Sequence, residues 1–402
     1  MRILELYKKT FSGLSVDVWK IALIYLVNRC GEMVIPFMSV YLTFQLGFTK
    51  GESGVTLLCF GLGAMVGSNV GGYLSDRIGN FKVMTLSLTG TGIGFISLIF
   101  FESLFAISLW LALTAVFSSM FSPAAFSGVA LWGKPENKTR GFSLLRMAIN
   151  LGIAIGPALG GLLAFYVGYK ALFVFDGMTC FIAVAVLQMV LSHRKNKTPR
   201  PLDIKESKMS PYRDWVVLLF LLFNLINMIA FFQILFSVPV YFKEELLMNE
   251  KLIGAFFTLN GLLVFALEMP LVYIIEKNNN YFKPLVTGAL LIGLGYLSLS
   301  IFDNPLVAIL LYSVLVALGE VINFPLIPSL VMRRADDQNQ GKYMGVVSMM
   351  FATAFALAPI SGLPVVEKIG YHTYWNVAAG LSILSGLFLW LLKGHFVKTS
   401  PE

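Results

Sequence analysis

Long apolar runs separated by short polar breaks dominate this sequence. The runs reach roughly 20 residues or more, which is enough for an α-helix to cross the hydrocarbon core of a bilayer. They lack the alternation typical of barrel strands, and only helices and closed barrels satisfy all their backbone groups in lipid. The pattern predicts twelve spans with approximate limits 17–44, 51–74, 82–101, 104–132, 140–167, 171–191, 214–242, 251–275, 283–302, 305–332, 342–366 and 371–392. An all-α membrane protein with twelve transmembrane helices is therefore expected.

The distribution of charge sets the expected topology of these spans. Only 13% of the 402 residues are charged and 57% are hydrophobic, whereas soluble domains carry about 25% charged residues. Of the 30 Lys and Arg, 22 fall in the termini and the even-to-odd loops, and cytoplasmic loops are enriched in these residues. Both termini are therefore expected in the cytoplasm, in a multi-pass protein of the cell (inner) membrane. The net charge of +8 follows from this topology, so no nucleic-acid partner is expected.

A polar stretch in the middle of the chain divides the spans into two groups of six. Residues 193–214 are rich in Lys, Arg, Pro and Ser, which is typical of a linker. The halves also repeat, because Gly156-Pro157 in span 5 is followed 202 residues later by Ala358-Pro359 in span 11. Two pseudo-symmetric bundles are typical of transporters that work by alternating access. The expected domains are an N-terminal six-helix bundle at 1–191, a cytoplasmic linker at 192–213 and a C-terminal six-helix bundle at 214–402.

The loop after span 2 carries a charged glycine motif. It reads GGYLSDRIGNFKV and contains Gly72, Leu74, Asp76, Arg77, Gly79 and Lys82. Glycine permits close helix approach at 72 and a tight reversal at 79, and Asp76 suits a helix N-terminus. The motif resembles the signature loop of the major facilitator superfamily, Gly-x-Leu-x-Asp-Arg-x-Gly-x-(x)-Lys, with Asn80 where a basic residue is usual. The resemblance implies the major facilitator fold and a cytoplasmic latch that holds the outward-facing state. An ordinary charged turn is the alternative.

Span 5 reads RMAINLGIAIGPALGGLL and combines spaced glycines with a proline. Glycines four residues apart form a smooth groove for another helix, and proline permits bending. The pattern resembles the antiporter signature of the drug:proton exchangers in the same superfamily, with matches at Gly152, Gly156, Pro157, Gly160 and Gly161. The resemblance implies a hinge and seal between the halves, in a protein that exports its substrate. Generic glycine-rich packing is the alternative. Span 4 lacks the arginine motif of many such antiporters, a role that Arg29 or Arg146 could fill.

Ionisable side chains inside the predicted spans are the candidates for proton coupling. Arg29 and Glu32 share one face of span 1 and can partly neutralise each other. In span 5, Arg146 and Asn150 lie four residues apart, and Glu320 is an isolated carboxylate of span 10. Burial disfavours the charged form of a carboxylate, so such a group can carry a proton. The resemblance implies that spans 1, 4, 7 and 10 line a central cavity, with Glu32 and Glu320 facing it from opposite halves. Glu320 is the strongest candidate, and a structural ion pair is the alternative for Arg29 and Glu32.

Other polar groups inside the spans have more ordinary interpretations. Asp176 opens span 6 and is expected either to cap helices or to pair with Lys170. The intramembrane amide side chains could line a cavity or connect helices; they are Asn28, Asn224, Asn227, Gln233, Asn260 and Asn323.

Together these features predict a secondary active transporter that works by alternating access and exports small amphipathic or lipophilic compounds in exchange for protons. One alternative is proton-coupled uptake of a peptide, siderophore or other metabolite, because Arg29 and Glu32 faintly resemble the Glu-x-x-Glu-Arg pattern of the oligopeptide symporters. A lipid flippase of the same fold and a non-transporting receptor are the others. No HExxH, GxSxG or phosphate loop occurs, so an enzyme is not expected. No cofactor or metal is expected either. The expected partners are a small-molecule substrate, protons and the lipid bilayer, and the protein is expected to be a monomer.

Overall fold

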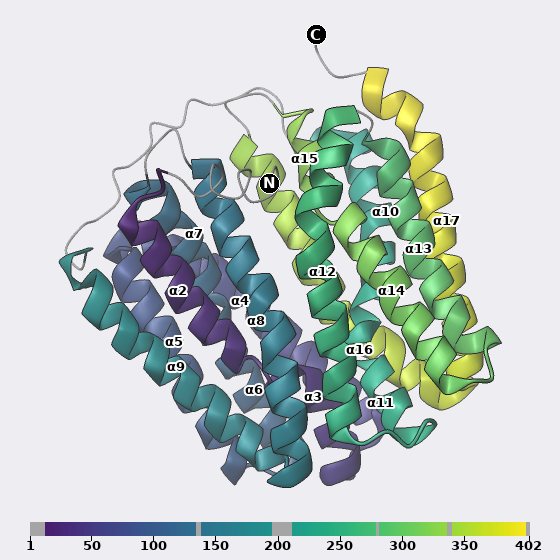
Figure 1. Cartoon of the computed structure of the whole chain (residues 1–402), viewed down its shortest axis with the longest axis horizontal. Coiled ribbons are helices and arrows are strands. Elements are labelled where there is room, and N and C mark those ends of the chain that lie inside the picture. Colours follow the sequence, from purple (N-terminus) through teal and green to yellow (C-terminus); the bar gives the residue numbers. More distant parts are fainter. Residues whose placement is uncertain (1–12, 134–137, 195–210, 279–280, 336–339, 399–402) are drawn as a thin grey trace, which may run out of the picture. The chain divides into compact units, whose positions relative to one another are not determined.

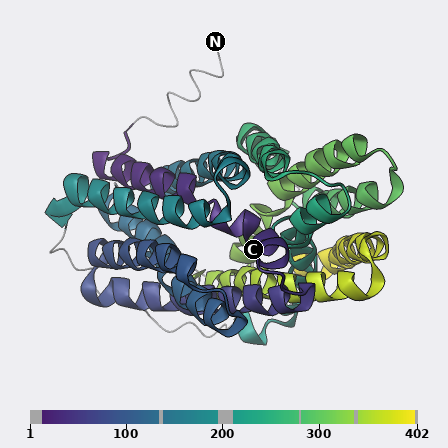
Figure 2. The same cartoon turned by 90° about the horizontal axis from the view of Figure 1, so that it is seen from below.

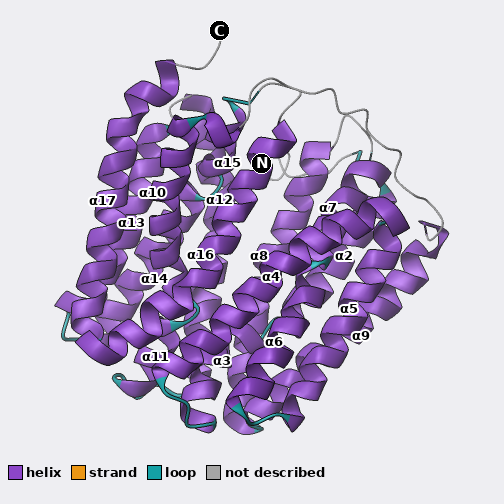
Figure 3. Cartoon of the chain, turned by 180° about the vertical axis from the view of Figure 1, so that it is seen from behind, coloured by secondary structure: helices purple, strands orange, loops and turns teal. Residues whose placement is uncertain are grey.

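Helices fill nearly all of the chain that the structure describes. The computed structural model describes residues 13–133, 138–194, 211–278, 281–335 and 340–398, and Figure 3 shows helices and loops but no strand in that part. Within it, twelve helical segments are long and apolar enough to span a membrane: Val16–Gln45, Lys50–Ile78, Asn80–Phe100, Leu104–Trp132, Leu144–Tyr166, Tyr169–Leu191, Trp215–Glu244, Glu250–Val272, Phe282–Ile301, Pro305–Met332, Lys342–Ile369 and Tyr371–Phe396. Each coincides with a predicted span, so the twelve-span all-α fold is confirmed.

Eight of these spans are formed by one main helix each, and four are divided (Figure 1). The single helices are α4 (Lys50–Ile78), α5 (Asn80–Ser97), α8 (Lys138–Tyr166), α9 (Tyr169–Leu191), α12 (Glu250–Asn278), α13 (Phe282–Ile301), α16 (Gln340–Ile369) and α17 (Tyr371–Lys398). The divided spans are span 1, with α2 (Val16–Gly31) and α3 (Val34–Val40); span 4, with α6 (Leu104–Ser119) and α7 (Phe121–Trp132); span 7, with α10 (Trp215–Phe231) and α11 (Ser237–Glu244); and span 10, with α14 (Pro305–Asn323) and α15 (Leu326–Met332). Every third span is therefore interrupted.

A proline explains where each divided span is interrupted. Proline has no N–H and its ring clashes with the carbonyl group four residues earlier. Counting back four residues from Pro36, Pro123 and Pro328 gives Glu32, Ser119 and Phe324, and each of these lies where the first helix of its span ends. In span 7 the residue four before Pro239 is Leu235, which follows the short 3₁₀ segment Phe232–Ile234 after α10. Proline permits such a break without forcing it, since Pro157 lies inside the continuous helix α8. A proline at the break thus recurs in spans 1, 4, 7 and 10, so the sequence repeats this feature every three spans.

The chain divides into two compact units. Unit 1 consists of Met1–Phe37 and Leu62–Pro201, and unit 2 consists of Met38–Gly61 and Leu202–Glu402. In unit 1, α2 and α9 lie side by side in both views (Figures 1 and 2). The apolar core of unit 1 joins these helices to α5, α7 and α8, with Ile21, Met84, Phe121, Leu145 and Leu187 among its fully buried side chains.

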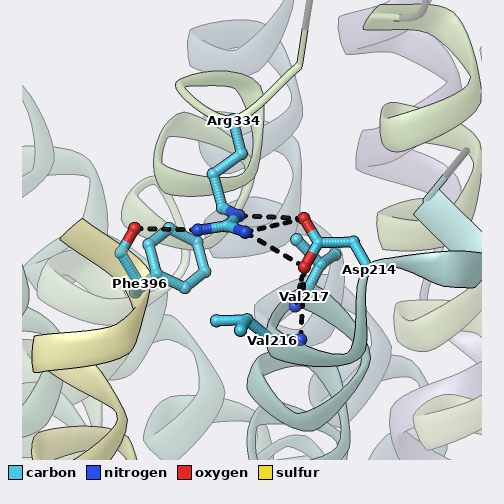
Figure 4. Close-up of polar contacts among 5 residues, drawn as sticks. All are labelled: Asp214, Val216, Val217, Arg334 and Phe396. Atoms are coloured by element: carbon cyan, nitrogen blue, oxygen red, sulfur yellow. Dashed lines mark hydrogen bonds and ion pairs between the residues drawn. The ribbon is translucent and has the colours of Figure 1, made fainter. Parts of the chain in front are cut away.

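The core of unit 2 is built in the same way from α10, α13, α15, α16 and α17, and includes Phe220, Leu285, Ile327, Val347 and Leu389. An ion pair fixes one end of this core (Figure 4). Arg334, which follows α15, contacts both carboxyl oxygens of Asp214, with its Nη2 atom 2.9 Å from Oδ2 and 3.0 Å from Oδ1. Arg334 also donates to the carbonyl of Phe396 in α17 at 2.9 Å. Asp214 in turn accepts from the first backbone amides of α10, so one buried pair joins three helix ends.

The beginning of α4 is attached to the other helices of unit 2. Lys50 Nζ lies 2.7 Å from Glu244 Oε2, and the hydroxyl of Tyr371 donates to the same oxygen at 2.6 Å. The backbone amide of Gly51 donates to Glu367 at 3.1 Å. These contacts explain why the first part of α4 belongs to unit 2 although the rest of the helix belongs to unit 1.

Candidate functional site

The interruption of span 1 places charged side chains inside a membrane-spanning segment. Helix α2 ends at Gly31 and α3 begins at Val34, so Glu32 and Met33 are not helical. Glu32 has φ −68° and ψ 66°, and its backbone amide donates to the carbonyl of Arg29. Because Pro36 removes the helical partner for the carbonyl of Glu32, the chain opens at the residue that carries the carboxylate.

Arg29 and Glu32 form an ion pair across this break, as their spacing predicted. The guanidinium Nη1 of Arg29 donates to Oε2 of Glu32, and the two side chains are 22% and 28% exposed. A second guanidinium nitrogen, Nη2, donates to the hydroxyl of Tyr25 at 3.3 Å. That hydroxyl shares a hydrogen bond with Ser122 of α7. The pair is therefore held between two divided spans of unit 1, spans 1 and 4.

A second carboxylate reaches the same break from span 6. Asp176 of α9 is 1% exposed, and its Oδ2 accepts from the backbone amide of Val34, the first residue of α3, at 3.4 Å. The alternative pairing with Lys170 is wrong, because Lys170 is not among the groups that interact with Asp176, which include Val34, Met33, Glu32 and Arg29. The Lys170 ammonium lies 2.9 Å from Glu102. The interpretation of Asp176 as a helix cap is confirmed. The sequence could not show which helix it caps, since Val34 lies 142 residues away.

Small residues let the neighbouring helices approach the break closely. A Cβ atom at Gly31 would lie 2.7 Å from Cβ of Thr179 in α9. In span 5, three members of the predicted glycine pattern face the same place. A Cβ atom at Gly152 would lie 2.9 Å from the carbonyl carbon of Arg29, one at Gly156 would lie 3.2 Å from the carbonyl oxygens of Arg29 and Glu32, and one at Gly160 would lie 2.7 Å from Cβ of Met33. The glycine ladder of α8 thus packs on the interrupted backbone of span 1 within unit 1.

The comparisons with known proteins agree with this architecture. The sequence matches the Major Facilitator Superfamily over residues 21–359 and 224–401, which together cover most of the chain. The chain belongs to the major facilitator superfamily.

Individual relatives support transport rather than catalysis. The chain is 27% identical over 334 residues to YqjV, described as an uncharacterized MFS-type transporter of Bacillus subtilis, covering 79% of this chain and 78% of the relative. It is 26% identical over 329 residues to the multidrug resistance protein MdtH of Aeromonas hydrophila, covering 81% and 82%. A crystal structure of a mutant of the peptide transporter POT has the same fold, with TM-score 0.83, 16% identity and 96% of each chain covered. This major facilitator protein is therefore a multi-pass membrane transporter and not an enzyme.

The remaining glycine-pattern residues and polar candidates of unit 1 all lie on α8. Pro157 and Gly161 are buried, Asn150 is half-buried and Arg146 is exposed. Arg146 lies two turns before the glycines that contact the break, on the same helix. Its proposed role in coupling stays a prediction.

The signature loop of this major facilitator transporter joins α4 to α5. Asp76, Arg77 and Lys82 are exposed, and the guanidinium carbon of Arg77 lies 4.4 Å from the ring centroid of Tyr73. Gly79 has φ 87°, a conformation that favours glycine, so the predicted tight reversal is present. A Cβ atom at Gly72 would meet nothing within 4 Å among the residues that the structure describes, so the expected close helix approach is not seen there.

Gly71 and Asn80 make the close contacts of this loop instead of Gly72. A Cβ atom at Gly71 would lie 2.6 Å from Cα of Met120 in span 4, so the contact falls one residue earlier than expected. Asn80, which replaces the usual basic residue, is 2% exposed and donates to Ser127 at 3.2 Å.

Glu320 lies in α14, one turn before the break of span 10. Its side chain is half-buried, and its backbone carbonyl accepts the amide of Phe324 at 3.0 Å. Both acidic candidates, Glu32 and Glu320, therefore lie at or next to a break of a divided span. A break changes geometry more easily than a continuous helix, because its backbone lacks the regular hydrogen bonds.

Three of the amide side chains, Asn227, Gln233 and Asn323, connect helices in unit 2, whereas Asn224 donates to the carbonyl of Phe220 within α10. Asn323 donates to the carbonyl of Leu285 at 2.9 Å, and Ser382 donates to Asn227 at 3.0 Å. Gln233, in the short segment Phe232–Ile234 between α10 and α11, is fully buried and donates to the carbonyl of Ala358 in α16 at 2.8 Å. Two of these amides, Gln233 and Asn323, lie at or next to the break of a divided span, and each divided span carries a proline soon after its break.

Proposed function

We propose that this major facilitator transporter couples the entry of protons to the export of small amphipathic or lipophilic compounds by alternating access. The supporting observation is the Arg29–Glu32 ion pair at the break of span 1. A charged side chain inside a membrane helix costs about 2.5–3.5 kcal/mol even on insertion scales, and such groups mark ion and proton pathways. The 26% identity to a protein named for multidrug resistance supports export as the direction.

In this proposal Glu32 and Glu320 bind protons with different affinities in the two states of the transporter. A proton can bias an equilibrium between two states only by binding one of them more tightly. Movement at the breaks of spans 1 and 10 would change the surroundings of the two carboxylates. In unit 1 this movement would change the distance between Glu32 and Arg29. A carboxylate is more easily protonated when a neighbouring guanidinium moves away from it.

The proposal is tested with purified protein in liposomes and ethidium, a fluorescent lipophilic cation, under an imposed proton gradient. Glu320→Gln is expected to abolish gradient-driven ethidium transport while ethidium binding and exchange remain measurable. The matched control is Glu102→Gln, which removes a carboxylate that is 67% exposed and pairs with Lys170. Full uphill transport by Glu320→Gln would remove Glu320 from the coupling mechanism.

Uptake by proton symport is the second candidate, favoured by the position of Arg29 and Glu32 in span 1 and its likeness to the oligopeptide symporter pattern. The direction of flux separates the two. With an inward proton gradient in right-side-out vesicles, antiport predicts extrusion of the substrate and symport predicts its accumulation.

The wider organisation of the molecule forms part of the same proposal. We propose a monomer with both termini in the cytoplasm, six-helix bundles at 1–191 and 214–402, a latch in the span 2 loop and a hinge at the glycines of span 5. The excess of Lys and Arg in the even-to-odd loops supports the orientation. Labelling of single cysteines introduced in opposite loops, with a membrane-impermeant reagent, would test it.

A further inference from the structure

Two carboxylates and one guanidinium lie around the break of span 1, since Asp176 accepts from the amide of Val34, two residues after Glu32. We call Arg29, Glu32 and Asp176 the charged cluster. Arg29 and Glu32 are paired directly, and Asp176 interacts electrostatically with both, repelled by Glu32 and attracted by Arg29. With all three groups charged, the cluster carries one surplus negative charge inside the membrane-spanning part of unit 1.

The surroundings of Asp176 do little to stabilise that surplus charge. Its Oδ2 receives one long hydrogen bond from Val34, and the amide of Met33 also faces the carboxyl group. Its Oδ1 is buried and accepts no hydrogen bond of normal geometry from the described residues. The nearby thiol of Cys180 is a weak donor and instead accepts from Asn28, at 3.7 Å. A buried carboxylate with so few donors is costly to keep ionised.

The other described charged groups on the elements packed against α9 either contact partners other than Asp176 or are exposed. Lys170 contacts Glu102, and His193 and Lys20 contact Asp17 at the opposite end of α2. The described charged side chains that remain on the packed elements are Lys82 in the first turn of α5 and Arg146 in α8, both exposed.

From this geometry we propose that Asp176 is a second proton-binding residue of the transporter, and that Arg29, Glu32 and Asp176 hold one exchangeable proton as a unit. This inference rests on the proposed proton coupling and names a carboxylate beyond those of spans 1 and 10. The proton neutralises the surplus charge and resides on Glu32 or Asp176. When the proton leaves, the cluster becomes negative at the point where Asp176 caps α3, so proton occupancy acts directly on the break of span 1.

If the two carboxylates share one proton, replacing either of them alone should abolish its binding. Removing either carboxylate leaves one carboxylate facing Arg29, so no surplus charge remains to be neutralised. Asp176→Asn and Glu32→Gln are each expected to abolish the same proton-binding event, and the double variant should lose no more than either one. Arg29→Gln removes the positive charge and is expected to increase the number of bound protons.

The test is pH-difference infrared spectroscopy of the purified full-length protein in lipid, which detects the carbonyl stretch of protonated carboxylic acids without any substrate. The wild-type protein should lose a carboxylic-acid band as the pH is raised, and that band should be absent from Asp176→Asn and from Glu32→Gln. It should be retained in Glu102→Gln. Persistence of the full band in Asp176→Asn, or additive losses in the two single variants, would overturn the inference.

The variants also separate proton binding from helix capping. The side-chain oxygen of Asn at 176 can still accept from the amide of Val34, so Asp176→Asn should unfold thermally close to the wild type. Should it fail to fold, Glu32→Gln still tests the shared proton. Because the infrared readout requires no transport, a protein that binds this proton but does not export ethidium would contradict the proposed function and leave the role of Asp176 standing.

Discussion

The breaks of spans 1 and 7 both divide a membrane-spanning segment into two helices, but one contains charged side chains and the other a neutral amide. Both lie four residues before a proline, Pro36 in span 1 and Pro239 in span 7. The break of span 1 contains the Arg29–Glu32 ion pair. Gln233, in the short segment Phe232–Ile234 between the two helices of span 7, lies six residues before Pro239 and is neutral.

The polar groups at the break of span 7 form hydrogen bonds without any charged side chain. The Gln233 amide donates to the carbonyls of Ile229 and Ala358 and to Ser361, and its oxygen accepts from Ser237 at 2.7 Å. Span 11 packs on it through Gly362, just as span 5 packs on the break of span 1 through its glycines.

This difference shows that a divided span does not require ionised groups. Hydrogen bonds from one amide and two hydroxyl groups complete the break of span 7, whereas buried charges are often no more stabilising than neutral replacements. Charges are therefore not needed to form such a break, which supports the proposed role of Arg29 and Glu32 in proton coupling. The one buried ion pair of Figure 4, Asp214 with Arg334, is in unit 2 but lies outside the membrane-spanning segments, where it joins helix ends.

The largest effect is expected from Glu32→Gln, which puts a neutral amide side chain, like that of Gln233 in span 7, into the break of span 1. Gradient-driven ethidium transport should fall to the level of protein-free liposomes, because the exchangeable proton is lost, while the thermal unfolding temperature should change little. Liposome flux and thermal unfolding of the same preparation measure both. Retention of gradient-driven transport would show that the charge in span 1 is structural.

Arg334→Met is expected to have the next largest effect, and on folding. Removing one member of a buried ion pair typically costs about 3–5 kcal/mol, and the Asp214 and Arg334 side chains are only 9% and 6% exposed. The free energy of unfolding should fall by that amount, while the fraction that remains folded keeps its pH dependence of transport. A loss of coupling without a loss of stability would contradict the division of roles between the two ion pairs.

Gln233→Leu should have a smaller effect and should likewise leave coupling intact. The buried hydroxyl of Ser237 would lose the amide oxygen to which it donates, and the loss of such a partner costs about 1–3 kcal/mol. The expected result is a lower unfolding temperature with gradient-driven transport per folded molecule unchanged. Uncoupled transport in this variant would mean that the neutral break also carries protons.

An effect on stability of about the same size is expected from a methyl group added to the glycine ladder. Gly152→Ala would press on the backbone of Arg29, and overpacking of this kind typically costs about 1–3 kcal/mol. The shift of Arg29 should also weaken proton coupling. Gly72→Ala is the matched control for stability, because its Cβ atom would meet open space. Equal unfolding temperatures for the two variants would argue against close packing of α8 on the break.

The sequence alone predicted the spans and the family, because both depend on signals local in the chain. Runs of apolar residues fix the twelve spans, and the motif from Gly72 to Lys82 lies within one loop. The pairing of Arg29 with Glu32 was equally accessible, since residues three apart share a helix face.

Contacts between distant parts of the chain could not be read in this way. The cap that Asp176 provides for α3 and the packing of Gly152 on Arg29 each join helices more than a hundred residues apart. Their geometry depends on how the helices pack, which no single-sequence pattern encodes. The four prolines that follow the breaks are local signals that a span can be divided. They do not by themselves separate divided from continuous spans, because Pro157, Pro270, Pro359 and Pro364 lie inside continuous helices.

The central claim, that the break of span 1 exchanges a proton during transport, is tested most directly by measuring proton release when substrate binds. Ethidium binding to the purified protein is first established by its fluorescence, and the pH of a weakly buffered sample is then followed as ethidium is added. We expect the wild type and Gln233→Leu to release protons, whereas Glu32→Gln should bind ethidium and release fewer protons or none. Equal release by the wild type and Glu32→Gln would contradict the central claim.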